Sequence, residues 1–190
     1  EELNLNSKTA GRQNDLELIA TRWLAHSGYG INKRLKRFLA MYFPNSVIRR
    51  QMWQETGVRL GRGTYLNLGV SVIDDYQSGE VLLELGAHCS VGPGVIFIAC
   101  SHHNNSVSLR RMGLLASYEK REKIIVQNDV WIGAHSTILP GVTIGKASII
   151  GANSLVNRDI APYSLAYGSP IRIIKDLRVG AGEPRKGRHD

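Results

Sequence analysis

The stretch VQNDVWIGAHSTILPGVTIGKASIIGANSLV, residues 126 to 156, carries an aliphatic residue at every sixth position. A six-residue period fits neither the 3.6-residue repeat of a helix nor the longer strands of a meander. It predicts short strands joined by corners, three to a coil, with residues eighteen apart stacked on neighbouring coils. The aliphatic series is Val126, Ile132, Ile138, Ile144, Ile150 and Val156, and a small or β-branched residue follows four positions later at Val130, Ser136, Val142, Ser148 and Ser154.

The same spacing continues towards the amino terminus. On this interpretation the aliphatic side chains fill the coil, and the glycines that follow them, such as Gly133, Gly145 and Gly151, supply the positive φ of the corners. A β-sandwich is the alternative, but its turns are spaced by roughly 8 to 12 residues. The earlier repeat positions are Leu85, Val91 and Phe97, and then, more weakly, Leu60, Leu66 and Val72.

The 190-residue chain is long enough for one such domain with a helical appendage. We expect an N-terminal helical segment over residues 1–57, a β-helix over 58–177 and a charged, glycine-rich tail over 178–190. The six-residue phase disappears between residues 102 and 123, which predicts a loop ejected from the coil. Such loops often carry the chemistry of a regular scaffold.

Composition and charge bound the function. The net charge of +8 attracts anionic partners, and the two cysteines, Cys89 and Cys100, cannot form a disulfide framework. No apolar run approaches the roughly 18 to 20 residues of a membrane span, and the first ten residues hold no apolar signal core. These features lead us to expect a cytoplasmic protein.

Two helices are predicted before the repeat. The first carries Leu16, Ile19, Ala20, Trp23 and Leu24 at helical spacing. The second carries an apolar stripe and a basic side, which allows contact with an anionic membrane surface or simple packing of the stripe on the domain. Its apolar residues are Ile31, Leu35, Phe38, Leu39 and Tyr42, and its basic residues are Lys33, Arg34, Lys36 and Arg37.

The run from Asn128 to Ile174 resembles the signature of the left-handed β-helix acyltransferases, within which it is most similar to the maltose, galactoside and nodulation sugar O-acetyltransferases. The resemblance covers about residues 58–177. It implies an all-β chain, a left-handed parallel β-helix of hexapeptide repeats with an N-terminal helical segment. It also implies a homotrimer with active sites at the seams between copies.

The resemblance further implies specific roles. His102, at the start of the ejected loop, matches the catalytic histidine, and Asn67 and Asp75 match a pair near the acceptor sugar. Acetyl-CoA is the implied acyl donor, with no metal. The residues implied to contact acetyl-CoA are Ala134, Ala152, Asn157, Arg158, Arg172 and Lys175. Asn157 replaces a more usual threonine, and extra residues around Gln77 to Leu82 alter the acceptor region.

These residue types suit acetyl transfer to a hydroxyl. An alcohol is a poor nucleophile at neutral pH, and a neutral imidazole at His102 is a suitable base for direct transfer without an acyl-enzyme. Asp75 either orients the imidazole or binds a sugar hydroxyl. We expect a sugar acceptor, from a cell-surface saccharide or its precursor.

The other candidate side chains have less specific roles. Adjacent residues of an extended chain face opposite ways, so only one of His102 and His103 can face the donor. We expect His88 and His135 to lie on the surface or at subunit contacts. Cys100 is a conceivable nucleophile, and Trp131 is expected to pack at a coil corner.

Three other functions compete with this interpretation. A xenobiotic O-acetyltransferase shares the scaffold, and the sequence NRDIAPY is similar to one found there. A β-helix zinc carbonic anhydrase would use histidine ligands, whose spacing is not recognisable in this chain. A nucleic-acid-binding protein would suit the charge, but the sequence contains no groove-reading helix or stacking platform.

Overall fold

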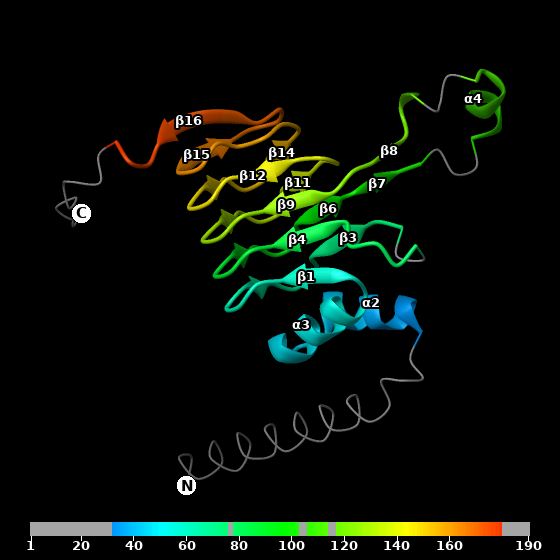
Figure 1. Cartoon of the computed structure of the whole chain (residues 1–190), viewed down its shortest axis with the longest axis horizontal. Coiled ribbons are helices and arrows are strands. Elements are labelled where there is room, and N and C mark those ends of the chain that lie inside the picture. Colours follow the sequence, from blue (N-terminus) through cyan, green and yellow to red (C-terminus); the bar gives the residue numbers. More distant parts are fainter. Residues whose placement is uncertain (1–31, 76–77, 103–105, 114–116, 180–190) are drawn as a thin grey trace, which may run out of the picture.

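The computed structural model describes residues 32–75, 78–102, 106–113 and 117–179. Within them the chain winds into a three-sided column of parallel β-sheets, with two helices at one end (Figure 1). The first sheet contains β1 (Val58–Leu60), β4 (Leu83–Leu85), β9 (Ile124–Val126) and β12 (Thr143–Ile144). The second contains β2 (Tyr65–Leu66), β5 (Ser90–Val91), β10 (Trp131–Ile132), β13 (Ile149–Ile150), β15 (Ser164–Tyr167) and β16 (Arg172–Asp176). The third contains β3 (Ser71–Ile73), β6 (Ile96–Ile98), β11 (Thr137–Ile138) and β14 (Leu155–Val156).

The predicted eighteen-residue stacking is confirmed by the strand register. Val126 pairs with Ile144 in the first sheet, and Ile132 pairs with Ile150 in the second. Every member of the aliphatic series from Val126 to Val156 is buried, as are the five residues of the small series. The parallel pairing also removes the β-sandwich alternative, because sandwiches are built from antiparallel sheets.

The expectation that the repeat glycines supply positive φ is wrong. Positive φ falls two residues later, as at His135 with a φ of 56°, while Gly133 itself lies outside that region. A Cβ atom on Gly133 would lie 2.5 Å from the backbone nitrogen of Ala152 on the next coil. These glycines are therefore required by the close stacking of coils. Positive φ occurs instead at other corner positions, some of them glycines such as Gly63, Gly69, Gly94 and Gly141, and others not: His88, Asp129, His135, Ala147, Asn153 and Tyr163.

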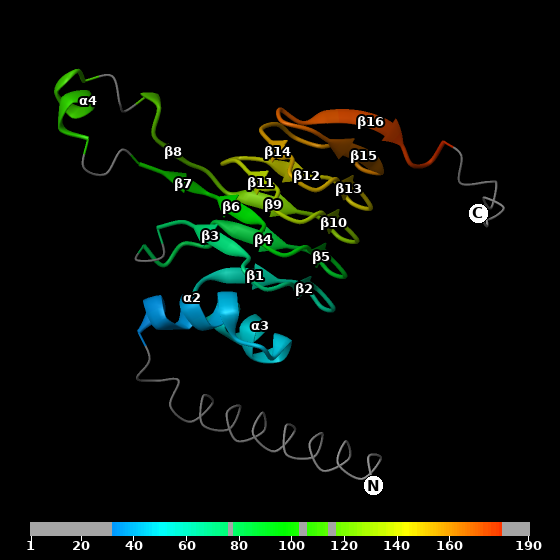
Figure 2. The ribbon, with the colours of Figure 1, turned by 180° about the vertical axis from the view of Figure 1, so that it is seen from behind.

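Helices α2 (Lys33–Tyr42) and α3 (Ser46–Glu55) cover the first coil (Figure 2). Buried arginines on these helices donate to carbonyl oxygens that the first coil leaves without a strand partner. Arg37 donates to the Val72 oxygen at 2.8 Å, and Arg49 donates to the Leu66 oxygen at 3.2 Å. The helices thus close an end of the column that would otherwise expose unpaired backbone groups.

This arrangement corrects the predicted orientation of the second helix. Arg37, placed on the solvated side, is buried, while Leu35, Phe38 and Tyr42 of the predicted apolar stripe are about half exposed. The reason is that backbone carbonyls at the end of the coil need donors, which an arginine supplies. The first predicted helix, over Leu16 to Leu24, lies outside the described residues.

The loop predicted between residues 102 and 123 leaves the column on two short strands. These are β7 (Cys100–Ser101) and β8 (Lys120–Arg121), which pair antiparallel, and the short helix α4 (Val107–Arg111) lies beyond them. Figure 1 shows this excursion projecting from the column beside the third sheet. At the opposite end from the helices, β16 turns back to pair antiparallel with β15.

Candidate active site

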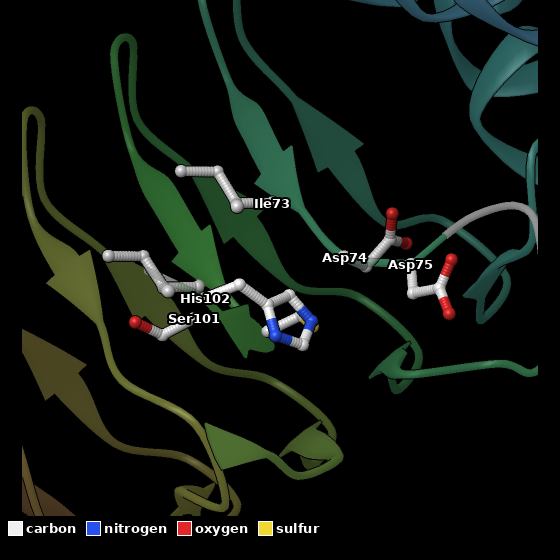
Figure 3. Close-up of a pocket in the computed structure, with 7 residues that line it drawn as sticks. Ile73, Asp74, Asp75, Ser101 and His102 are labelled. Carbon is white, nitrogen blue, oxygen red and sulfur yellow. The ribbon is translucent and has the colours of Figure 1, made fainter. Parts of the chain in front are cut away.

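A pocket of about 440 Å³ lies where β3 and β6 end. The two strands pair in parallel with Ile73 opposite Ile98, so the residues that follow them emerge at the same corner of the column. Figure 3 shows the two aspartates at the end of one strand and the His102 ring beyond the end of the other. The pocket is lined by Ile73, Asp74, Asp75, Ile98, Cys100, Ser101 and His102.

His102 lies between a thiol and a carboxylate. Its Nε2 is 2.7 Å from the Cys100 Sγ, and its Nδ1 is 3.7 Å from a carboxylate oxygen of Glu119 on the returning arm of the loop. The His102 side chain is half exposed, so the ring is accessible from the pocket. In this arrangement His102 is placed as a base, and Glu119 is placed as the acidic group that could orient its ring.

The Cys100 thiol is held in its protonated form. Burial raises the pKa of this thiol, and the nearby negative charges of Asp75, Asp74 and Glu119 raise it further, while Arg121 opposes them. A protonated thiol can donate to Nε2 of His102 in the tautomer that carries its hydrogen on Nδ1, the nitrogen nearer Glu119. The arrangement therefore favours His102 as a base and disfavours Cys100 as a nucleophile, since reactive cysteines have a lowered pKa.

The two aspartates have different environments. Asp74 is nearly fully buried, and its Oδ2 accepts from Arg37 of α2 at 2.7 Å. Its Oδ1 has no hydrogen-bond partner among the described residues. Asp75 is more exposed, and the Nε of Arg121 lies 4.0 Å from its Oδ2. Arg121 makes a closer ion pair with Glu80, at 2.6 Å.

The residues predicted to contact the acyl donor lie on both sides of the third sheet. Ala134 and Ala152 occupy stacked corners just before that sheet, and Asn153 of the upper coil donates to the Ala134 oxygen at 2.9 Å. Ala152 is exposed and Ala134 is partly exposed. Arg172 is placed near this corner, because it pairs with Tyr167 at the end of β15.

The remaining predicted donor contacts are at the other corner and on the terminal strand. Asn157 and Arg158 directly follow β14, and Arg158 donates to the Ile171 oxygen at 2.8 Å. Lys175 lies on β16 opposite Leu165. All three residues are exposed. The two cationic ones, Arg158 and Lys175, lie on the last coils, at the end of the column remote from α2 and α3.

Comparisons with known proteins agree with this architecture. A family model described as bacterial transferase hexapeptide (six repeats) matches residues 123–158. A galactoside O-acetyltransferase of Lactococcus lactis is 35% identical over 146 residues, covering 75% of this chain and 66% of that protein. The galactoside O-acetyltransferase of Escherichia coli K12 is 35% identical over 122 residues, covering 64% and 55% respectively.

A solved structure gives the same result. A hexapeptide-repeat-containing acetyltransferase from Vibrio cholerae, complexed with acetyl coenzyme A, matches with a TM-score of 0.60 at 27% identity. The match covers 76% of this chain and 85% of that one. The chain is similar to the hexapeptide-repeat acetyltransferases in sequence and in fold. Its fold is the left-handed parallel β-helix that the resemblance implies. The chain spans 55% to 66% of the length of these two curated relatives.

The structure of this hexapeptide-repeat protein brings some predicted site residues together and leaves others apart. His102 and Asp75 share the pocket, whereas Asn67 does not line it and instead accepts from the Leu68 backbone nitrogen. Asn67 follows β2, and Asp75 follows β3 one corner later, which explains the separation. His103 lies outside the described residues.

The exposure of three other residues can be compared with the predictions made for them. His88 and His135 lie at corners with positive φ, and both are exposed, which confirms the surface position expected for them. Trp131, expected to pack at a corner, instead points outward from β10 and is 57% exposed. In the repeat it occupies the position before the buried aliphatic Ile132, and alternation along the strand directs it to solvent.

Sequence reasoning missed Arg37, Asp74 and Glu119. Asp74 sits beside a predicted residue, but its burial depends on a helix 37 positions earlier. Glu119 lies in the irregular loop, where the repeat gives no register. Among the described residues no group of three or more metal-ligating side chains is close enough to hold an ion. No helix of the described part combines the length and hydropathy needed to cross a bilayer.

Proposed function

We propose that the protein is an acetyl-CoA-dependent O-acetyltransferase that acts on a sugar hydroxyl, with His102 as the general base. The observation that carries the proposal is the placement of His102 in a pocket with Asp75, with its Nε2 2.7 Å from the Cys100 thiol and its Nδ1 3.7 Å from Glu119. The galactoside O-acetyltransferase relatives support the acceptor class.

In this proposal the acceptor hydroxyl replaces the Cys100 thiol as the donor to Nε2 of His102. As the hydroxyl oxygen attacks, His102 removes its proton, because a neutral alcohol is a poor nucleophile. The Glu119 carboxylate then stabilises the positive charge on the ring and maintains its orientation. His102 returns the proton to the departing sulfur, and general base catalysis of this kind contributes roughly 10²- to 10⁴-fold.

The residues present fit the acyl donor. Acetyl-CoA, when bound, supplies the acetyl group as a thioester. The exposed corners at Ala134 and Ala152 carry only methyl side chains, which leaves the backbone accessible to an extended arm. Arg172 and Lys175 on β16, with Arg158 and Asn157 at the other corner, offer donors for phosphate oxygens.

A homotrimer with sites at the seams is part of the proposal. The outward faces of the sheets carry large apolar side chains, including Trp131 at 57%, Ile73 at 47% and Tyr65 at 44% exposure. Association would cover such groups. It would also give Asn67, which is outside the pocket of its own chain, a pocket on a neighbouring copy to contact.

The experiment that tests the function is acetyl transfer by the purified chain to a panel of sugars and to chloramphenicol. Free thiol release is followed with acetyl-CoA as donor, and products are identified by mass spectrometry as singly acetylated sugars. The proposal predicts sugar products that disappear in His102→Ala. Products from chloramphenicol alone would favour the xenobiotic alternative, and release of thiol without any acetylated acceptor would contradict both.

A further inference from the structure

The pocket beside His102 has an electrostatic asymmetry that bears on which acceptor it takes. The described residues that line the pocket include two carboxylates and one imidazole but no lysine or arginine. Glu119 adds a third carboxylate on the far side of the His102 ring. This negative character contrasts with the net charge of +8 for the whole chain.

The nearest cations are directed away from the pocket or shared. Arg37 of α2 pairs with Asp74 and also donates to the backbone oxygens of Val72 in β3 and of Thr56 at the end of α3. Arg121 lies 4.0 Å from Asp75 but makes its shorter contact, 2.6 Å, with Glu80. Arg121 is therefore shared by two carboxylates, and the group around Asp75 keeps a net negative charge.

The two aspartates of the pocket differ in what a ligand can reach. Asp74 is only 3% exposed, and its charge is paired with Arg37. Asp75 is 43% exposed, so its carboxylate is open to a ligand in the pocket. A carboxylate oxygen only accepts hydrogen bonds, so a hydroxyl or ammonium donor suits it and an anionic group does not.

The negative charges around the pocket also affect the pKa of the Cys100 thiol. After burial, the largest cause of its raised pKa is the negative charge of Asp75, and Asp74 and Glu119 act in the same direction. Among the described residues, Arg121 opposes them. A neighbouring anion is thus disfavoured at the position that an acceptor would occupy.

We propose that Asp75 selects the acceptor by charge: the pocket takes a sugar ring that is neutral or carries an ammonium group, and it disfavours a ring that carries a carboxylate or sulfate. The inference rests on the proposed acetyl transfer to sugars and specifies its acceptor class.

The cationic residues proposed to bind the donor phosphates lie far from the acceptor pocket. Arg172 and Lys175 lie on β16, at the end of the column opposite the helices, whereas Asp74 and Asp75 follow β3 in the first coil. The chain therefore offers cations for the phosphates of the donor and carboxylates for the acceptor. Electrostatic complementarity of this kind excludes wrong partners, because like charges brought together are strongly disfavoured.

The experiment compares isosteric acceptors that differ only in charge. One pair is methyl galacturonamide and methyl galacturonate, which differ at C6. The other is the N-methylsulfonyl and N-sulfo derivatives of methyl glucosaminide, which differ at C2. Whichever hydroxyl reacts, at least one pair retains it. We measure kcat/KM for each compound at low and high salt, with acetyl-CoA as donor.

The expected result is at least about a tenfold preference for the neutral member of a pair. The preference should shrink at high salt, because salt screens charges at exposed sites. Asp75→Asn, at a partly exposed position, should shrink it at low salt as well. Asp129→Asn is the matched control, since Asp129 lies at a different corner with a φ of 59° that asparagine tolerates, and it should leave the preference unchanged.

Equal or better transfer to the anionic members would overturn the charge selection while leaving sugar acetylation intact. A neutral preference that neither salt nor Asp75→Asn changes would also overturn it, since shape would then explain the preference. Absence of transfer to every sugar, neutral ones included, would refute the proposed function, and the inference with it.

Discussion

The Sγ of Cys100 lies 2.7 Å from Nε2 of His102, within the pocket that also contains Asp75. A thiol this close to an imidazole could be a nucleophile beside its base. The raised pKa of the Cys100 thiol argues against that role, because reactive cysteines have a lowered pKa. In the proposed mechanism Cys100 is a neutral donor to Nε2 of His102 until an acceptor hydroxyl takes its place. This relationship leads to two predictions that separate the thiol from the imidazole.

Replacement of Cys100 by alanine should leave acetyl transfer within about tenfold of the wild type, because no acyl-cysteine forms. Steady-state kinetics with acetyl-CoA and a sugar acceptor provide the measurement. Alkylation offers an independent check: since the pKa of Cys100 is raised above its usual value of 9.0, iodoacetamide should modify it slowly at pH 7 and faster above pH 9. A loss of 10²-fold or more in Cys100→Ala, together with acetyl-cysteine in peptide maps, would contradict this view.

Replacement of His102 by alanine should reduce kcat by about 10² or more through loss of the base, with the thermal transition unchanged. The ring is half exposed, so its removal leaves no buried cavity. His103→Ala is the matched control, because it removes an imidazole from the adjacent position. Normal turnover in His102→Ala with a large loss in His103→Ala would assign the base to the other histidine.

Sequence alone predicts the regular part of this molecule and little of its site. The register of Val126 against Ile144 follows from a period of six, because each coil repeats the same environment. The ion pair of Arg37 with Asp74 depends on how a helix caps the coil, and no local pattern encodes that position. Trp131 shows a third case: it is expected to pack at a corner but is 57% exposed, because alternation along the strand directs it outward.

The Glu119→Gln substitution should lower kcat by roughly tenfold. It should have little effect on the KM for acetyl-CoA. The Glu119 carboxylate lies 3.7 Å from Nδ1 of His102, and its charge stabilises the ring as the ring takes up the acceptor proton. Glu122→Gln is the control, because Glu122 is exposed on the same arm and pairs with Lys120 instead. Equal effects of the two substitutions would reduce the role of Glu119 to a general charge effect.

The close stacking of coils makes Gly133 intolerant of a side chain. A Cβ atom there would lie 2.5 Å from the Ala152 nitrogen, and strand pairing on both sides prevents the coils from separating. Gly133→Ala should therefore destabilise the fold by about 1 to 3 kcal/mol, as overpacking of a rigid interior does. Because Ala152 is a proposed donor contact, the variant should also raise the KM for acetyl-CoA.

Gly113→Ala provides the comparison for this last substitution. Gly113 lies on the exposed loop with a φ of 67°, and a Cβ atom added there would meet no other atom within 4 Å, so alanine introduces backbone strain but no clash. Differential scanning calorimetry of both variants should show a larger decrease in melting temperature for Gly133→Ala. A decrease of the same size in both would mean that the coils adjust to an added methyl group, and the distance between neighbouring coils would then not account for glycine in the repeat.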